Sequence, residues 1–118
     1  MKKIIYFLLL FTIYSCNLST TGVNVSVTNN SDRSIKNVKC YTSEEKDVLT
    51  FASVNPSEEK VGYLSMKKNK TDGHYILELT TEKGKSVKHI DSYYSNGKPS
   101  SQTIIFEIQN DTVICSTK

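Results

Sequence analysis

Hydrophobic and polar residues alternate with a period of two along most of the chain. The alternation is clearest where Val23, Val25 and Val27 are separated by polar residues. Such a pattern is typical of β-strands that bury one face. Segments rich in Asn, Asp, Gly, Pro and Ser, which are typical of turns, separate the alternating segments. We predict seven or eight short strands, within residues 23–28, 35–40, 48–54, 60–66, 75–79, 87–93, 104–108 and 112–115.

This succession of short strands favours an all-β fold, a single antiparallel β-sandwich. The segment from Val27 to Val38, in which a polar turn joins two strands, resembles the first hairpin of bacterial Ig-like domains, and the resemblance implies Greek-key order. It concerns the fold alone, because sandwiches host many unrelated functions. The alternation fails near Asn37, where we expect a β-bulge. The strand at residues 87–93 is rather polar, so we expect it near a sheet edge.

One face of each predicted strand must be buried. The alternation assigns valine, isoleucine, leucine and aromatic residues to this face. The predicted core consists of Val23, Val25, Val27, Ile35, Val38, Leu49, Phe51, Val61, Tyr63, Tyr75, Leu77, Leu79, Ile104, Phe106 and Ile108.

The first sixteen residues have a different pattern. Two lysines follow Met1, and Ile4 to Ile13 is an almost wholly apolar run. A run of about ten residues is too short for a membrane-spanning helix, which needs about 20. A charged start, an apolar run and then small residues are typical of a secretory signal peptide. We therefore predict export.

The end of this leader, Ile13-Tyr14-Ser15-Cys16, resembles the relaxed lipobox of Bacteroidota lipoproteins. The resemblance implies that residues 1–15 are a cleaved signal peptide and that Cys16 carries a diacylglycerol with palmitate-like chains. Residues 16–22 would then be a flexible tether, and residues 23–118 the β-sandwich domain. The alternative is an ordinary signal peptide cut near Ser15, with Cys16 a spare thiol.

The residues after Cys16 lack the Asp that resembles an inner-membrane retention signal and the acidic run that resembles a surface-export signal. We therefore expect a lipid anchor in the outer membrane of the cell envelope, with the domain facing the periplasm. The formal net charge is +3, and loss of Lys2 and Lys3 with the leader leaves +1. This charge is too small for a nucleic-acid-binding surface.

Cys40 and Cys115 remain once Cys16 is lipidated. Cys40 shares a strand face with Val38, and Cys115 shares one with Val113, so both are expected to point inward. Export to an oxidising compartment favours a disulfide between them. It would close a loop of roughly 75 residues and stabilise the fold by about 4 kcal/mol. The alternative is two small buried thiols that never meet.

Two segments are candidates for modification or binding. Asp111-Thr112-Val113 resembles the Bacteroidota O-glycosylation site, which implies a glycan on Thr112; otherwise Thr112 is simply a strand residue after a turn. Tyr93, Tyr94 and Lys98 flank a turn-rich loop, and exposed tyrosine beside a loop is common in partner surfaces. The alternative there is one core tyrosine and one tyrosine on the rim.

Little in the sequence suggests catalysis. There are two histidines, at positions 74 and 89, and they do not have zinc-site spacing. No Gly-x-Ser-x-Gly motif occurs. We expect a non-catalytic module without metal or cofactor, which binds an envelope protein or glycan. Two alternatives stay open: an anchored inhibitor or immunity protein against a secreted toxin or a hydrolase such as lysozyme, and a small hydrolase.

Overall fold

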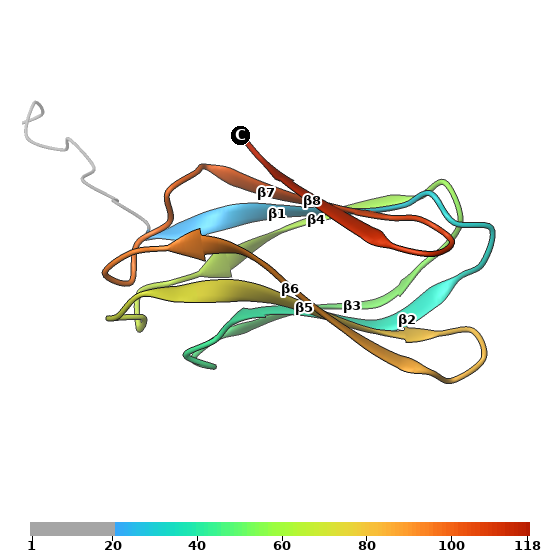
Figure 1. The fold of residues 1–118 in the computed structure, drawn as a ribbon, viewed down its shortest axis with the longest axis horizontal. Coiled ribbons are helices and arrows are strands. Elements are labelled where there is room, and N and C mark those ends of the chain that lie inside the picture. The colour runs from blue at the N-terminus through green and yellow to red at the C-terminus, as the bar shows by residue number, and fades with distance from the viewer. Residues whose placement is uncertain (1–20) are drawn as a thin grey trace, which may run out of the picture.

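A computed structural model describes residues 21–118 and confirms the all-β prediction. Eight strands form two four-stranded sheets that pack face to face as a sandwich (Figure 1). No helix in these residues is long and apolar enough to span a membrane. The strands are β1 (Gly22–Asn29), β2 (Ile35–Thr42), β3 (Val48–Val54), β4 (Glu59–Ser65), β5 (Gly73–Thr81), β6 (Ser86–Tyr94), β7 (Thr103–Ile108) and β8 (Val113–Thr117).

The first sheet has the strand order β4-β1-β7-β8 and the second β3-β2-β5-β6. All neighbours are antiparallel except β1 and β7, which are parallel, so the predicted antiparallel sandwich needs this one correction. A parallel pair needs a long crossover. Here the whole of the second sheet lies between β1 and β7 in the chain, which provides one.

Two local predictions are confirmed. β6 pairs only with β5 and is therefore an edge strand. β2 is bulged at Asn37, which has a positive φ of 50°, and its register against β5 shifts between Lys36 and Lys39. Because of the bulge, Ile35 and Val38 both face the core although they are three residues apart.

Most of the predicted core is buried between the sheets, and Leu49 and Phe51 pack against it while remaining partly exposed. The prediction for β4 is wrong by one residue, because Val61 and Tyr63 are 62% and 42% exposed. Their neighbours Gly62 and Leu64 face inward instead. A Cβ on Gly62 would lie 2.7 Å from Leu49 Cδ1, so the sheets approach closely where Gly62 has no side chain. A slip of one residue exchanges the two faces of a strand.

The two ends of the sandwich differ in what they carry. The described chain enters beside the end of β4, where the Thr21 carbonyl accepts a hydrogen bond from the Met66 N–H over 2.9 Å. The β1–β2 loop, the β5–β6 hairpin and the β7–β8 hairpin all lie at the opposite end (Figure 1). These three connections form the site described next.

Candidate functional site

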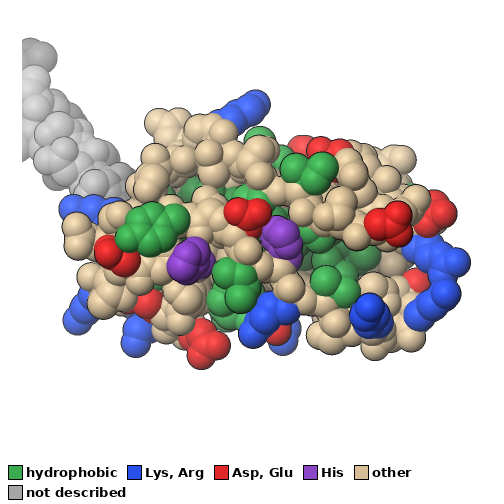
Figure 2. Space-filling model, viewed as in Figure 1, with side chains coloured by type: hydrophobic (Ala, Val, Ile, Leu, Met, Phe, Trp, Pro, Cys, Tyr) green, Lys and Arg blue, Asp and Glu red, His purple; other side chains and the backbone are tan. Residues whose placement is uncertain are grey.

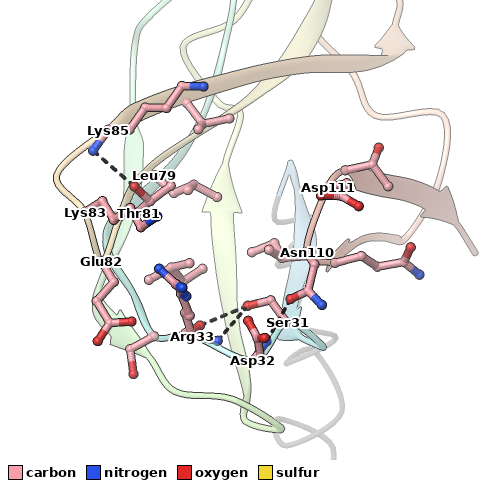
Figure 3. Close-up of a pocket in the computed structure, with 16 residues that line it drawn as sticks. Ser31, Asp32, Arg33, Leu79, Thr81, Glu82, Lys83, Lys85, Asn110 and Asp111 are labelled. Atoms are coloured by element: carbon pink, nitrogen blue, oxygen red, sulfur yellow. Dashed lines mark hydrogen bonds between the residues drawn. The ribbon is translucent and has the colours of Figure 1, made fainter.

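A cleft of about 820 Å³ opens between the sheets at the end far from Thr21 (Figure 3). The β1–β2 loop and the two hairpins make its walls. Aliphatic side chains from both sheets make its floor, and they are Ile35, Leu79, Val87 and Ile108. The cleft is therefore a place where the ends of the sheets separate. Val87 is partly exposed there, and the other three floor residues are at most 5% exposed.

Asn29 holds the β1–β2 wall in place. Its fully buried side chain donates to the carbonyls of Arg33 and Val54 at 2.8 and 2.9 Å. Its amide oxygen accepts from the Ser31 N–H at 3.0 Å, which is the local turn that Asn favours. The Asn110 side chain then accepts from the Asp32 N–H at 3.0 Å and joins this loop to the β7–β8 hairpin.

The β5–β6 wall is a tight hairpin. Gly84 occupies its tip with a φ of 83°, which glycine adopts at no steric cost. The Thr81 N–H donates to the Lys85 carbonyl at 2.8 Å, and the Lys85 N–H donates to Thr81 Oγ1 at 3.1 Å. The walls of the cleft are thus fixed by hydrogen bonds within and between the loops.

Charges of both signs surround the cleft (Figure 2). Figure 3 shows the Arg33 side chain rising from the β1–β2 loop toward the hairpin that carries Thr81 and Lys83. The ion pairs within residues 21–118 lie elsewhere, so none of these charges is paired within 4.0 Å. The charged lining residues are Arg33, Lys83, Lys85, Asp32, Glu82 and Asp111.

The lining contains no histidine, cysteine or aromatic residue. Among residues 21–118, no three His, Cys, Asp or Glu side chains are grouped so that they could hold a metal ion. His89 Nε2 lies 3.2 Å from Asp91 Oδ2, but both residues are on β6 and outside the cleft lining. The cleft therefore offers an aliphatic floor with charged and amide groups above it, which suits binding of an amphipathic ligand.

Thr112 lies at the rim of this cleft. It is exposed, immediately precedes β8, and its carbonyl accepts from the Gln109 N–H at 2.8 Å. O-glycosylation there stays a prediction, and a glycan at this position would stand over the cleft.

The predicted surface of Tyr93, Tyr94 and Lys98 needs correction. Tyr94 is fully buried, with its ring centroid 5.4 Å from that of Tyr75. The cause is a second bulge at Ser92, with a φ of 62°, after which Tyr94 points inward. Tyr93 is half exposed, and its ring lies edge-on to that of His74 with the ring centroids 5.7 Å apart. Lys98 is exposed. One tyrosine thus belongs to the core and one to the rim, and a partner surface at Tyr93 and Lys98 stays a prediction.

Glu44 is a polar centre that sequence patterns do not indicate. Its carboxylate accepts hydrogen bonds from the Lys70 and Thr71 N–H groups at 2.9 and 3.1 Å and from the Tyr94 hydroxyl at 2.5 Å. These donors, first the Lys70 N–H, lower the pKa of Glu44 to about 2. The partners lie 26 to 50 residues away in the chain, so no local motif reveals them.

Cys40 and Cys115 face the core from opposite sheets, as expected, but both are free thiols and the predicted disulfide is absent. Burial raises the pKa of Cys40 to about 12. Burial, with a smaller contribution from Asp91, raises that of Cys115 to about 11. Cys16 and the leader lie outside the described residues, so lipidation stays a prediction.

Comparison with known proteins yields a likeness of fold. No protein-family model matches the chain, and no curated protein sequence matches it. The fold is similar to the NMR structure of a protein from Eubacterium rectale, with a TM-score of 0.57 and 11% sequence identity. The match covers 82% of this chain and 88% of that one. At this identity the likeness supports the sandwich architecture alone.

Proposed function

We propose that this chain is a lipid-anchored lipoprotein of the cell envelope whose β-sandwich is a non-catalytic binding module. One observation carries the proposal: the cleft opens at the end of the sandwich opposite Thr21. If Cys16 bears the lipid, the short segment before Thr21 holds that end near the membrane. The cleft then faces away from the bilayer, where a partner can reach it.

The anchor follows from the lipobox-like end of the leader. Each buried CH₂ of an acyl chain contributes about 0.8 kcal/mol to membrane binding, and one chain alone binds only marginally. The two or three chains of a bacterial lipoprotein give lasting attachment. The segment after Cys16 carries neither sorting feature described above, which favours the outer membrane and the periplasmic side.

The size and lining of the cleft support binding rather than catalysis. Ligand sites typically measure about 300–1,000 Å³, and the cleft, at about 820 Å³, falls within this range. Its four aliphatic floor residues suit an apolar segment of the ligand. Its unpaired charges and amides suit polar groups beside that segment.

A pull-down from solubilised envelopes tests the proposal, with the full-length lipidated protein as bait. Lys83 and Lys85 are exposed residues of a hairpin tip, so reversal of both charges should leave the fold intact. We expect the double variant Lys83→Glu, Lys85→Glu to lose the captured partner. The matched control is Lys98→Glu, a charge reversal at the other end of the sandwich, which should retain it.

Two results would contradict the proposal. If intact mass in the membrane fraction shows that the mature protein does not begin with an acylated Cys16, the lipid anchor is contradicted. If the partner is lost with Lys98→Glu but retained by the double variant, the cleft is contradicted as the binding site. Capture of a secreted toxin or hydrolase whose activity falls on binding would identify the anchored inhibitor as the form that the module takes.

A further inference from the structure

We infer that the ligand of the module is an extended polypeptide segment of a partner protein, which pairs as an additional strand with the free edge of β8 and places apolar side chains in the adjoining cleft. The inference deepens the proposed function and rests on it. Three features of the structure carry it: the hydrogen-bonding groups of β8, the lack of edge protection on that strand, and the chemistry of the cleft.

β8 presents unpaired backbone groups along one side. Thr103 and Lys118 exchange two hydrogen bonds, Lys118 N–H to Thr103 carbonyl at 3.0 Å and the reverse at 3.3 Å. In an antiparallel pair such residues alternate with residues whose N–H and C=O point away. The register of β7 and β8 therefore turns the backbone groups of Val113, Cys115 and Thr117 away from β7. No other strand within residues 21–118 pairs with that side.

The other edge strand on this side, β6, is protected against such pairing and β8 is not. β6 carries the bulge at Ser92 and the polar side chains of Lys88, His89 and Asp91. Bulges and charged side chains are common means of blocking an exposed edge. β8 has the sequence Val-Ile-Cys-Ser-Thr, without charge, proline or bulge. The edge strand β3 also lacks charge and proline, but neither its residues nor those directly flanking it line the cleft, whereas the two residues directly before β8 do.

The start of β8 adjoins the cleft, because Asp111 and Thr112 line it directly before Val113. Val113 and Cys115 face inward and are only partly buried. A strand paired with β8 would cover them and place alternate side chains on the aliphatic floor, since side chains of a strand alternate between faces. Main-chain bonds would give affinity and the floor would give specificity.

The lining favours a peptide over a glycan. Sugar rings are bound largely by stacking of their C–H faces on aromatic side chains, and the lining has none. An extended peptide needs a backbone edge and apolar pockets, and both are present. The charges of both signs above the floor suit a segment whose ends carry side chains of mixed charge.

The test uses the full-length protein in detergent micelles and a phage library of random linear twelve-residue peptides. We expect selection of peptides with aliphatic residues at alternate positions. Each backbone amide of the best peptide is then N-methylated in turn. Strand pairing predicts a period of two: methylation of alternate amides should weaken binding at least tenfold, and methylation of the intervening amides should have little effect.

Two proline variants locate the edge. Thr117→Pro removes an N–H that points away from β7, and proline is tolerated on such edges. The variant should bind the selected peptide at least tenfold more weakly than wild type does. Lys88→Pro is the matched control, because the register of β5 and β6 turns its N–H toward the free edge of β6. It should bind as wild type does. Melting curves check that both variants fold.

Several outcomes overturn the inference. They are a library that yields no binder, a methylation scan without the period of two, loss of binding in Lys88→Pro alone, and binding of peptidoglycan-derived oligosaccharides in place of peptides. Self-association lost in Thr117→Pro would assign the β8 edge to a second copy of this chain. An envelope partner that needs Lys83 and Lys85 but tolerates Thr117→Pro would contradict strand pairing while leaving the proposed function intact.

Discussion

The Tyr94 hydroxyl donates a hydrogen bond to the Glu44 carboxylate over 2.5 Å and thereby joins the end of β6 to the loop that follows β2. Glu44 also accepts from the N–H groups of Lys70 and Thr71, which belong to the β4–β5 connection. One carboxylate thus holds three segments together at the end of the sandwich where the chain enters. Charged acceptors make stronger hydrogen bonds than neutral ones, so this network depends on ionisation of Glu44.

The first prediction concerns the pH dependence of this network. The pKa of Glu44 is about 2 in the folded protein and 4.5 without the fold. A lowered pKa stabilises the folded state above the unfolded value, and this stability is lost as pH falls from 4.5 toward 2. Glu44→Gln should lower the melting temperature at pH 7 and should lose less with acid in that window than wild type does. Melting curves at half-unit pH steps measure both effects.

The comparison must be made with wild type at each pH, because hydrogen bonds from Asn30 and Gln109 also lower the pKa of Glu107. Tyr94→Phe is a second control, since it deletes one donor and leaves the two backbone N–H groups. This variant should lower the free energy of unfolding by about 1 kcal/mol. It should keep part of the dependence of stability on acid. Parallel acid responses in wild type and Glu44→Gln would show that Glu44 does not make these bonds in solution.

A second prediction compares two glycines that have positive φ. Gly97, at 72°, would place a Cβ 2.1 Å from the Asn69 carbonyl oxygen, whereas Gly84, at 83°, has open space. Left-handed backbone costs about 1–2 kcal/mol for other residues, and a core clash costs about 1–3 kcal/mol. Gly97→Ala should therefore lower the free energy of unfolding by about 2–5 kcal/mol, and Gly84→Ala should lower it by only about 1–2 kcal/mol. Urea unfolding measures the two, and equal losses would contradict the close approach.

A third prediction concerns the core and its wrongly predicted strand. Phe106 is fully buried at the centre of β7, and its replacement by alanine should cost about 3–5 kcal/mol, a large part of the stability of a domain this small. Val61 was predicted as core but is 62% exposed. Val61→Ala should therefore change the stability by less than about 0.5 kcal/mol. A large loss at Val61 would restore the predicted register of β4.

The strands could be predicted because each leaves a local pattern. β1 shows the strict alternation of Val23, Val25 and Val27, and all three are fully buried. β4 offers two patterns, since apolar residues occupy positions 61, 63 and 64. The choice between them is made by Leu49 and Phe51 of the other sheet, which fill the space beside Gly62. The pattern of residues within β4 does not indicate that contact, because Leu49 and Phe51 belong to another strand.

The cleft could not be predicted for the same reason. Its floor combines Ile35, Leu79, Val87 and Ile108, which pattern analysis treats as ordinary core residues or strand residues. They become a site only because the two sheets separate at one end, and that separation depends on the lengths and hydrogen bonds of three connections. Thr112, which was singled out for modification, does lie at this rim. The tyrosines that were singled out for binding lie near the other end.

The last prediction concerns the two thiols of the core. Cys40 is fully buried, Cys115 is partly buried, and burial raises the pKa of both. The thiolate is the reactive form of cysteine, so the folded protein should react slowly with iodoacetamide at pH 8. Cys115, with the lower pKa of about 11 and the greater exposure, should react before Cys40.

After unfolding in urea without reductant, protein purified from the envelope should take up two labels, one on each thiol, measured by mass spectrometry. Cys40→Ala should take up one. Cys16 adds no label when its sulfur is in a thioether. If unfolding exposes no thiol until a reductant is added, the two cysteines are joined in the cell. The Cα atoms of Cys40 and Cys115 must then lie within about 7 Å of one another, as a disulfide requires.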